Sequence, residues 1–195
     1  MEAIEAILTR RSTRNYKQDA VEQDKLDTIL DAARQAPSGG NNQTNHFLVI
    51  RNKEVLQMLI ELTQTAFSEM EAAENTYASL KHSIAASKKG GYVFCYNAPL
   101  LIVVANQKDY GNNMADCACA IENMMIAANA LDLGSCWINQ LRWLNEDPRL
   151  VAYLQTLGMK ESERVYGAVI IGCPASGLPN RNLMPQKGNE VTWID

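Results

Sequence analysis

Apolar side chains recur three and four positions apart in several stretches of the chain, and this spacing predicts helices. In the clearest case, a helix from about Gln23 to Gln35, the apolar positions are Leu26, Ile29, Leu30 and Ala33, and Pro37 ends the segment. The same reasoning predicts further helices over Glu2–Thr9, from Lys53 onward, from Met114 to Leu131 and from Pro148 to Leu157.

Short continuous apolar runs predict buried strands at Phe47–Ile50, Pro99–Ala105, Cys136–Ile138 and Val165–Ile171. The second run is apolar throughout, which is typical of a central strand buried on both faces. Residues 68–91 lack such a pattern and are rich in Glu, Ala, Ser and Lys. They fit a mobile lid or helical insertion as well as they fit a solvated surface excursion. The tail after Pro174 is polar and irregular.

The predicted helix from Met114 to Leu131 carries only two charges, Asp116 and Glu122, and is apolar around nearly its whole circumference. Such a helix is buried on all sides. Packing against the sheet and against a second subunit would achieve this, so we expect a homodimer with this helix near its core. A central helix of a monomer stays open as the alternative.

The composition is that of an ordinary globular protein, with 195 residues, 47% hydrophobic and 21% charged, and we expect one domain over residues 1–195. A formal charge of −4 does not favour nucleic acid or an anionic membrane as a partner. No signal peptide or membrane-spanning run is visible. Five cysteines without a framework spacing indicate a reducing, cytoplasmic location.

Two polar motifs stand out against this acidic background. Arg10-Arg11-Ser12-Thr13-Arg14 gathers three guanidinium groups and a hydroxyl, and arginine forks match phosphate oxygens. The turn Ala36–Gln43 is rich in glycine and asparagine, so backbone amides can approach a ligand closely. Together the motifs favour a phosphorylated, planar ligand such as flavin mononucleotide (FMN). A solvated helix end and a plain helix-stopping turn stay open as the alternatives.

Other candidate residues point less clearly to chemistry. The pair Cys117 and Cys119 has no further ligand at metal-binding spacing, so we expect core packing and no metal site. His46 flanks the glycine-rich turn, and whether its side chain faces the binding pocket stays open. His82 is expected on a surface helix. No glycine fingerprint of a dinucleotide-binding domain follows a predicted strand.

Four segments give the chain a family resemblance: RRSTRNY at Arg10–Tyr16, APSGGNNQTNHFLVI at Ala36–Ile50, LDLGSCWIN at Leu131–Asn139 and VYGAVIIGCP at Val165–Pro174. Through them the whole chain resembles the FMN-dependent nitroreductase family. The resemblance implies an α+β sandwich with a mixed central sheet flanked by helices. It also implies an intertwined homodimer with two FMN sites at its interface.

The resemblance further implies which residues hold the cofactor. Arg10, Arg11, Ser12 and Arg14 would come from one subunit, with Arg10 at the phosphate and Arg14 at the N1–O2 edge of the flavin. The other subunit would supply Pro37, Ser38, Gly39 and Asn41. The stretch Trp137, Ile138 and Asn139 would lie beside the ring, and Arg181 or Lys187 would complete the phosphate pocket. The chain departs from the family pattern at Thr44-Asn45, where Pro-Trp is usual, and at Cys173, where tyrosine is usual.

The flavin itself would carry the redox chemistry, so the resemblance assigns no catalytic side chain. Hydride from NAD(P)H would reach flavin N5 and pass on to a flat acceptor such as a nitroaromatic or quinone, in a ping-pong reaction. Three alternatives stay open: a flavin-binding or sensing protein without turnover, the same scaffold with dehalogenase or flavin-processing chemistry, and a structural dimer without cofactor.

Overall fold

The computed structural model describes residues 1–177, 182–185 and 187–194, and these are built around a four-stranded sheet. The strands are β1 (His46–Ile50), β2 (Leu100–Gln107), β3 (Gly134–Ile138) and β4 (Glu163–Gly172), in the order β1-β2-β4-β3. All three pairings between these strands are antiparallel. The mixed character expected of the sheet is confined to an isolated parallel bridge between Ser12 and Ser135.

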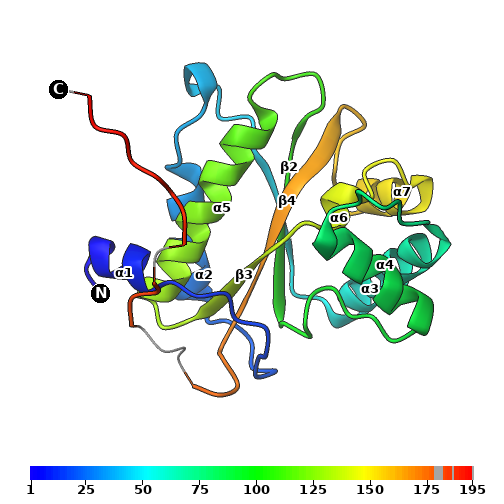
Figure 1. Ribbon diagram of the computed structural model, residues 1–195, viewed down its shortest axis with the longest axis horizontal. Coiled ribbons are helices and arrows are strands. Elements are labelled where there is room, and N and C mark those ends of the chain that lie inside the picture. Colours follow the sequence, from blue (N-terminus) through cyan, green and yellow to red (C-terminus); the bar gives the residue numbers. More distant parts are fainter. Residues whose placement is uncertain (178–181, 186, 195) are drawn as a thin grey trace.

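Helices cover both faces of the sheet, which confirms the predicted α+β sandwich (Figure 1). On one face α2 (Gln23–Arg34) packs against α5 (Asn113–Ala130), and the short α1 (Ala3–Thr9) lies on α5. The other face is covered by α3 (Lys53–Glu69), α4 (Ala78–Lys89), α6 (Gln140–Trp143) and α7 (Pro148–Thr156). Strand β2 is buried from Leu100 to Ala105, because its apolar side chains point alternately to the two faces of the sheet and helices cover both faces.

The segment without periodicity contains α4, a helix packed against α3. Ser83 on α4 is fully buried, and its hydroxyl lies 2.8 Å from the Tyr92 hydroxyl, which also accepts a 2.9 Å hydrogen bond from Gln140. The helical insertion is therefore tied to the end of β3. Helix α6 was not predicted, because its four residues are too few to show a helical period.

Helix α5 is buried on most of its circumference, but not on all of it. Ala115, Cys119 and Glu122 are exposed and lie at positions i, i+4 and i+7, so they form one stripe along the helix. The expectation that the helix is buried on all sides is thus wrong for the single chain. The prediction of core packing is confirmed for Cys117, which is fully buried. It is wrong for Cys119, because that side chain belongs to the exposed stripe.

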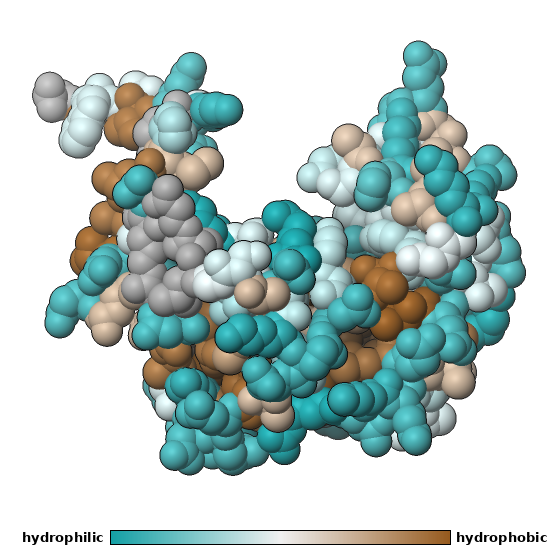
Figure 2. Space-filling model, turned by 90° about the horizontal axis from the view of Figure 1, so that it is seen from below, coloured by the Kyte–Doolittle hydropathy of each residue, from teal (hydrophilic) through white to brown (hydrophobic). Residues whose placement is uncertain are grey.

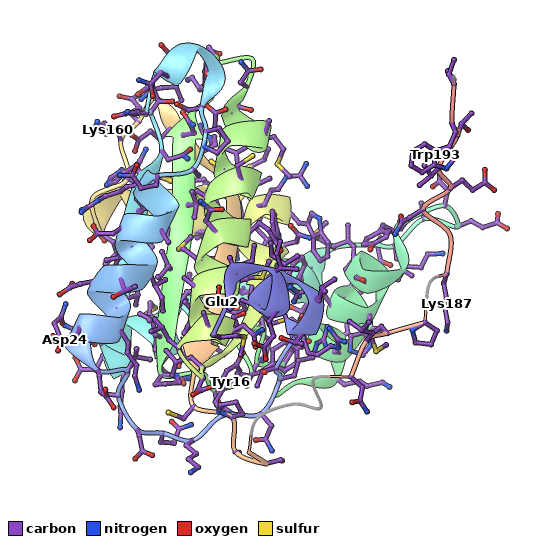
Figure 3. All side chains as sticks on the ribbon, turned by 90° about the vertical axis from the view of Figure 1, so that its left-hand side faces the viewer. Glu2, Tyr16, Asp24, Lys160, Lys187 and Trp193 are labelled. Atoms are coloured by element: carbon purple, nitrogen blue, oxygen red, sulfur yellow. The ribbon has the colours of Figure 1, made fainter. Side chains whose placement is uncertain are left out.

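The chain leaves the sheet beside the N-terminal segment and continues as a tail that stands away from the body (Figures 1 and 2). The Ala175 amide donates to the Asn15 carbonyl at 3.1 Å, and the Arg11 guanidinium donates to the Asn182 carbonyl. Beyond this point the tail carries Val191, Trp193 and Ile194, which are 70%, 84% and 93% exposed. Figure 3 shows Lys187 and Trp193 along this tail, apart from α2 and α5.

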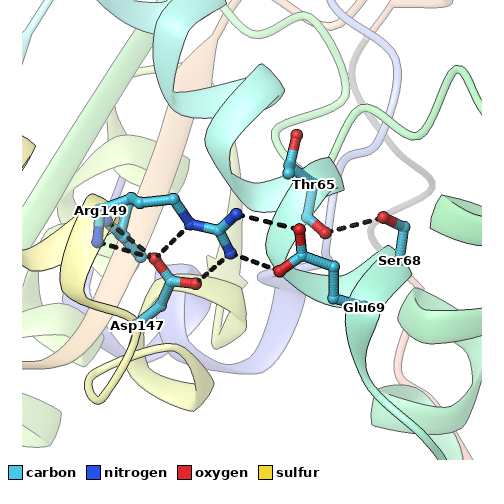
Figure 4. A network of polar contacts seen from close by, with 6 residues as sticks. Thr65, Ser68, Glu69, Asp147 and Arg149 are labelled. Atoms are coloured by element: carbon cyan, nitrogen blue, oxygen red, sulfur yellow. Dashed lines mark hydrogen bonds and ion pairs between the residues drawn. The ribbon is translucent and has the colours of Figure 1, made fainter.

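On the opposite face of the sheet, an ionic network joins α3 to α7 (Figure 4). Arg149 donates to both carboxylate oxygens of Glu69, at 3.0 and 2.7 Å, and to Asp147 at 2.7 Å. Asp147 also caps α7, because its carboxylate accepts from the Arg149 and Leu150 amides. The contacts fix the end of α3 against the start of α7. None of the helices in the described ranges combines the length and the apolar character needed to cross a bilayer.

Candidate functional site

The arginine-rich motif is a strap, residues 10–16, that lies against the start of β3. The Thr13 amide donates to the Ser135 carbonyl at 2.9 Å, and Ser12 bridges Ser135 in parallel. The approach is close because position 134 is glycine: a methyl group there would lie 2.6 Å from the Thr13 hydroxyl. The Tyr16 hydroxyl donates to the Thr13 carbonyl at 2.6 Å and closes the strap.

Arg10 reaches from this strap towards the middle of α5, where its Nε lies 3.8 Å from a carboxylate oxygen of Glu122. Its Nη1 is buried and has no hydrogen-bond partner among the described residues. A buried donor without a partner costs free energy, so a site for an anion here would be stabilising. A role of Arg10 at a phosphate stays a prediction.

The neighbouring basic residues differ from Arg10 in their partners. The Arg11 guanidinium donates to the backbone carbonyls of Leu8 and Arg10, at 3.1 and 2.7 Å, and to that of Asn182. These bonds hold the tail against the strap. Lys187 is exposed on the tail (Figure 3), and Arg181 lies outside the described residues. A contribution of either residue to a phosphate pocket stays a prediction.

Arg14 lines an open pocket of about 140 Å³ at the end of β3, together with Trp137, Ile138 and Asn139. The Arg14 guanidinium carbon lies 6.0 Å from the centre of the Tyr96 ring, within reach of a cation–π contact. Three further rings of this pocket were missed by sequence reasoning: those of Tyr77, Tyr96 and Trp143. They come from separate loops and helices, and no local pattern in the sequence connects them.

Within this pocket the end of β3 is held by hydrogen bonds. The Trp137 indole nitrogen donates to Asn139 at 2.8 Å, and the Asn139 amide donates to Gln140 at 3.1 Å. Ile138 is buried, so only its backbone can face a ligand. Burial raises the pKa of the neighbouring Cys136 thiol, although Arg14 and Ser12 partly offset the effect. Burial therefore favours the neutral form of the Cys136 thiol.

The glycine-rich motif, Ala36–Gln43, forms a tight turn at the opposite end of the sheet from the strap. Gly40, Asn41 and Gln43 have φ values of 59°, 54° and 51°, the left-handed region that glycine and asparagine tolerate best. The Gln43 amide donates to the Ser38 hydroxyl at 3.0 Å and closes the turn. Pro37 and Asn41 are exposed, whereas Ser38 and Gly39 are half-buried. The turn therefore presents a polar edge to its surroundings.

Asp116 anchors this turn, a role that sequence reasoning missed. Its carboxylate is buried and accepts from the Gly39 amide, at 3.1 and 3.3 Å. Asn45 donates to the Asp116 carbonyl at 3.0 Å and accepts from Asn106 at 2.9 Å. The departure from the usual Pro-Trp thus places an amide in a buried polar cluster. The available signal was Asp116 itself, one of two charges in an otherwise uncharged helix.

His46, the first residue of β1, contacts β4 and is not part of the polar cluster around Asn45. Its Nδ1 lies 2.8 Å from the Glu163 carboxylate, which is 1% exposed. Burial alone would raise the pKa of Glu163, but hydrogen bonds from His46 and from the Lys160 amide outweigh it and hold that pKa below its ordinary value. This pair joins the edge strand to β4.

The two motifs lie at opposite ends of the sheet. The strap is beside Ser135, which pairs with Ile171, whereas the turn adjoins Asn106 and His46, at the end where Gln107 pairs with Glu163. Along β4, Glu163 and Ile171 are about 26 Å apart at roughly 3.3 Å per residue. One chain therefore does not bring the strap and the turn into one pocket.

Comparisons with known proteins agree with this architecture. The model of the nitroreductase family matches residues 7–173. A protein of Archaeoglobus fulgidus, provisionally named an NADH dehydrogenase/NAD(P)H nitroreductase, is 31% identical over 89% of this chain and 86% of its own length. An FMN reductase (NADPH) of Bacillus subtilis is 28% identical over 78% of this chain and 59% of its own length.

Among solved structures, a nitroreductase with bound FMN from Bacteroides fragilis superposes with a TM-score of 0.88 at 36% identity, covering 100% of both chains. An FMN-dependent nitroreductase from Clostridium difficile gives a TM-score of 0.72 at 28% identity, over 98% of this chain and 99% of its own. Fold, motifs and family model converge, and the chain belongs to the nitroreductase family.

Proposed function

We propose that this protein is an FMN-dependent oxidoreductase that passes electrons from NAD(P)H to a flat acceptor such as a nitroaromatic or a quinone. The observation that carries the proposal is the unpartnered, buried Nη1 of Arg10 beside a strap with two further arginines. When bound, FMN would supply the redox chemistry, accepting a hydride from the nicotinamide and delivering it to the acceptor.

The residues fit a flavin in both charge and shape. Arg10 would bind the phosphate, because a guanidinium forms paired hydrogen bonds with phosphate oxygens. Arg14 lies at the exposed mouth of the aromatic pocket, where a fixed cation stabilises negative charge that develops on a reduced ring. No described side chain in this pocket is arranged as a nucleophile with its base. The proton that accompanies acceptor reduction would come from water.

We further propose that each flavin site is shared between two copies of the chain. In one chain the strap and the turn adjoin opposite ends of the sheet, near Ile171 and Glu163 of β4, which are about 26 Å apart at roughly 3.3 Å per residue. The stripe of Ala115, Cys119 and Glu122 is exposed on a helix whose other positions are buried or half-buried. A symmetric dimer through this stripe would cover it. It would also bring Pro37, Ser38, Gly39 and Asn41 of one subunit to Arg10, Ser12 and Arg14 of the other.

The test begins with the visible spectrum of the purified protein, before and after anaerobic addition of NADH or NADPH. Flavin bands that bleach, and return when a quinone or nitroaromatic compound is added, are the expected result. Bound flavin that neither reductant bleaches would instead favour a flavin-binding protein without turnover. A colourless protein that fails to take up added FMN would overturn the proposal.

A further inference from the structure

A series of side-chain hydrogen bonds runs from helix α4 to the end of β3. The Ser83 hydroxyl lies 3.1 Å from the Ser79 carbonyl and 2.8 Å from the Tyr92 hydroxyl. The Gln140 amide nitrogen donates to the Tyr92 hydroxyl at 2.9 Å, and the Gln140 amide oxygen accepts from the Asn139 backbone amide at 3.1 Å. Figure 1 shows α4 and α6, which begins at Gln140, on the same side of the sheet. The series therefore links the helical insertion to the candidate flavin site.

The two ends of this series fix the direction of every hydrogen bond in it. A backbone amide can only donate, so the Gln140 oxygen must face Asn139 and the Gln140 nitrogen must face Tyr92. A backbone carbonyl can only accept, so the Ser83 proton goes to Ser79. Tyr92 therefore gives its own proton to Ser83 and accepts one from Gln140. Burial raises the pKa of Tyr92, so its hydroxyl keeps the proton that this arrangement requires.

With its orientation fixed in this way, the Gln140 amide has one hydrogen left for a ligand. Its nitrogen carries two hydrogens, and the one that does not bind Tyr92 meets no acceptor in the described part of the chain. Gln140 is half-buried and lines the aromatic pocket next to Asn139. The Asn139 side-chain oxygen accepts from the Trp137 indole, and the Asn139 side-chain nitrogen likewise has no partner among the described residues.

The pocket is thus rich in donors and poor in acceptors. Three of its groups can only donate: the Arg14 guanidinium and the side-chain nitrogens of Asn139 and Gln140. Of the described residues that line it, none carries a carboxylate. The Tyr77 and Trp143 rings, with centres 6.2 Å apart, form an aromatic wall. A flat molecule that offers oxygen acceptors and no donors, such as a quinone or a nitroaromatic, matches both features.

We propose that the remaining amide hydrogen of Gln140 binds an oxygen of the electron acceptor, and that Tyr92 and Ser83 are positioning residues that orient it. The inference rests on the proposed oxidoreductase function and goes beyond it, because it names the residue that favours acceptors with an oxygen at this position. The same hydrogen bond stabilises the negative charge that the oxygen gains on reduction. Tyr92 acts without touching the substrate, since phenylalanine in its place would leave the Gln140 amide free to rotate.

Stopped-flow oxidation of the NADH-reduced holoenzyme tests the role of Gln140. Duroquinone is the probe, because its carbonyl oxygens accept hydrogen bonds and its methyl groups block attack by thiols. Ferricyanide is the reference oxidant, because it takes single electrons and needs no hydrogen bond to an oxygen at the pocket. In Gln140→Leu the ratio of the two rate constants, duroquinone to ferricyanide, should fall by about 3- to 10-fold, the loss of one neutral hydrogen bond.

Tyr92→Phe separates positioning from packing. Alone it should lower the same ratio by about 2- to 5-fold, because the Gln140 amide loses the bond that orients it. In a Gln140→Leu background it should have no further effect, since no amide remains to be oriented. The matched control is Tyr153→Phe on α7, which removes a hydroxyl that has no partner within the described ranges and should leave the ratio unchanged.

Binding of duroquinone to the oxidised protein, without NADH, gives a readout that does not depend on turnover. Quenching of tryptophan fluorescence measures it, because Trp137 and Trp143 line the pocket. The dissociation constant should rise by about 3- to 10-fold in Gln140→Leu. It should also rise in Tyr92→Phe and stay constant in Tyr153→Phe.

The outcomes distinguish this role of Gln140 from the function on which it rests. A protein that binds no FMN, or whose flavin neither NADH nor NADPH reduces, contradicts both. A reducible flavoprotein in which Gln140→Leu leaves the duroquinone ratio and the dissociation constant unchanged overturns the role of Gln140 alone. An equal loss in the rate of reduction by NADH would overturn it too, because the amide would then serve the flavin or the nicotinamide. Additive effects in the double variant would overturn the positioning by Tyr92.

Discussion

At the scale of single residues, the Nη1 atom of Arg10 and the carboxylate of Glu163 are both kept from water, but only the carboxylate has hydrogen-bond partners. The buried Nη1 of Arg10 lacks a partner within the described ranges, and leaving such a donor unpaired costs about 1–3 kcal/mol. The Glu163 carboxylate, in contrast, accepts from both His46 and Lys160. Arg10 is therefore suited to a ligand, whereas Glu163 is suited to holding the fold.

For Arg10 we expect that Arg10→Ala raises the dissociation constant of FMN by about 10- to 100-fold, because a charge-assisted hydrogen bond to phosphate is lost. Fluorescence titration of the apoprotein with FMN measures the change. Arg34→Ala is the matched control, since Arg34 is an exposed arginine on α2 that pairs only with Asp31 among described residues. Equal losses in the two variants would contradict a specific phosphate contact.

For Glu163 the prediction concerns stability and pH. Its folded pKa is depressed, so the stabilisation is present above the unfolded value of about 4.3 and is lost as the pH falls through the folded pKa. Glu163→Gln should lower the free energy of unfolding by about 1–3 kcal/mol at pH 7 and by much less at pH 3. Urea denaturation at the two pH values tests this. A loss that is the same at both would show that ionisation is not the cause.

At the scale of elements, the strap and β3 depend on one close approach. The Thr13 amide bonds to Ser135, and Thr13 is branched at Cβ, so it cannot easily turn away from a new neighbour. A methyl group on Gly134 would lie 2.6 to 2.8 Å from three side-chain atoms of Thr13. The position of the arginines in the strap is thus set by a glycine on the adjacent strand.

Gly134→Ala should therefore displace the strap, lowering the unfolding free energy by about 1–3 kcal/mol, as overpacking usually does, and weakening FMN binding as well. Gly111→Ala is the control, because no atom lies within 4 Å of the methyl group it would add. Thermal denaturation and FMN titration report the two effects. If the Gly134→Ala protein were destabilised but bound FMN with unchanged affinity, the position of the strap would not matter for FMN binding.

At the scale of the whole molecule, the exposed stripe on α5 and the separated motifs both point to a second copy. Cys119 lies in the middle of the stripe, between Ala115 and Glu122. A helix with small residues along one face allows close packing with its own copy. The proposed dimer would explain why the small side chains of Ala115 and Cys119 lie on a side of the helix that the chain itself does not cover, next to the single charge of Glu122.

Cys119→Arg should place a bulky charge against its own copy across the two-fold axis, shifting the protein from dimer to monomer and reducing its flavin content. Sedimentation velocity and the ratio of flavin to protein absorbance measure both. Met58→Arg places the same side chain on an exposed position of α3 and should change neither. A Cys119→Arg protein that stays dimeric would place the interface elsewhere.

Most of the elements, although not α4 or α6, and both motifs could be predicted from the amino-acid sequence alone. Helices and strands follow from local periodicity, so α2, β2 and α5 were predicted to within a few residues, and the arginine and glycine motifs carry their chemistry in their residue types. The nitroreductase family could be inferred from those motifs and their separation along the chain.

Which residues come into contact could be seen only in the folded chain. The aromatic pocket of Tyr77, Tyr96 and Trp143, the anchoring of Gly39 by Asp116 and the exposed stripe on α5 all join segments far apart in sequence. Periodicity reports which side of an element is apolar, but not what covers it. Contacts of this kind arise from packing between elements, and packing has no local signature in the sequence.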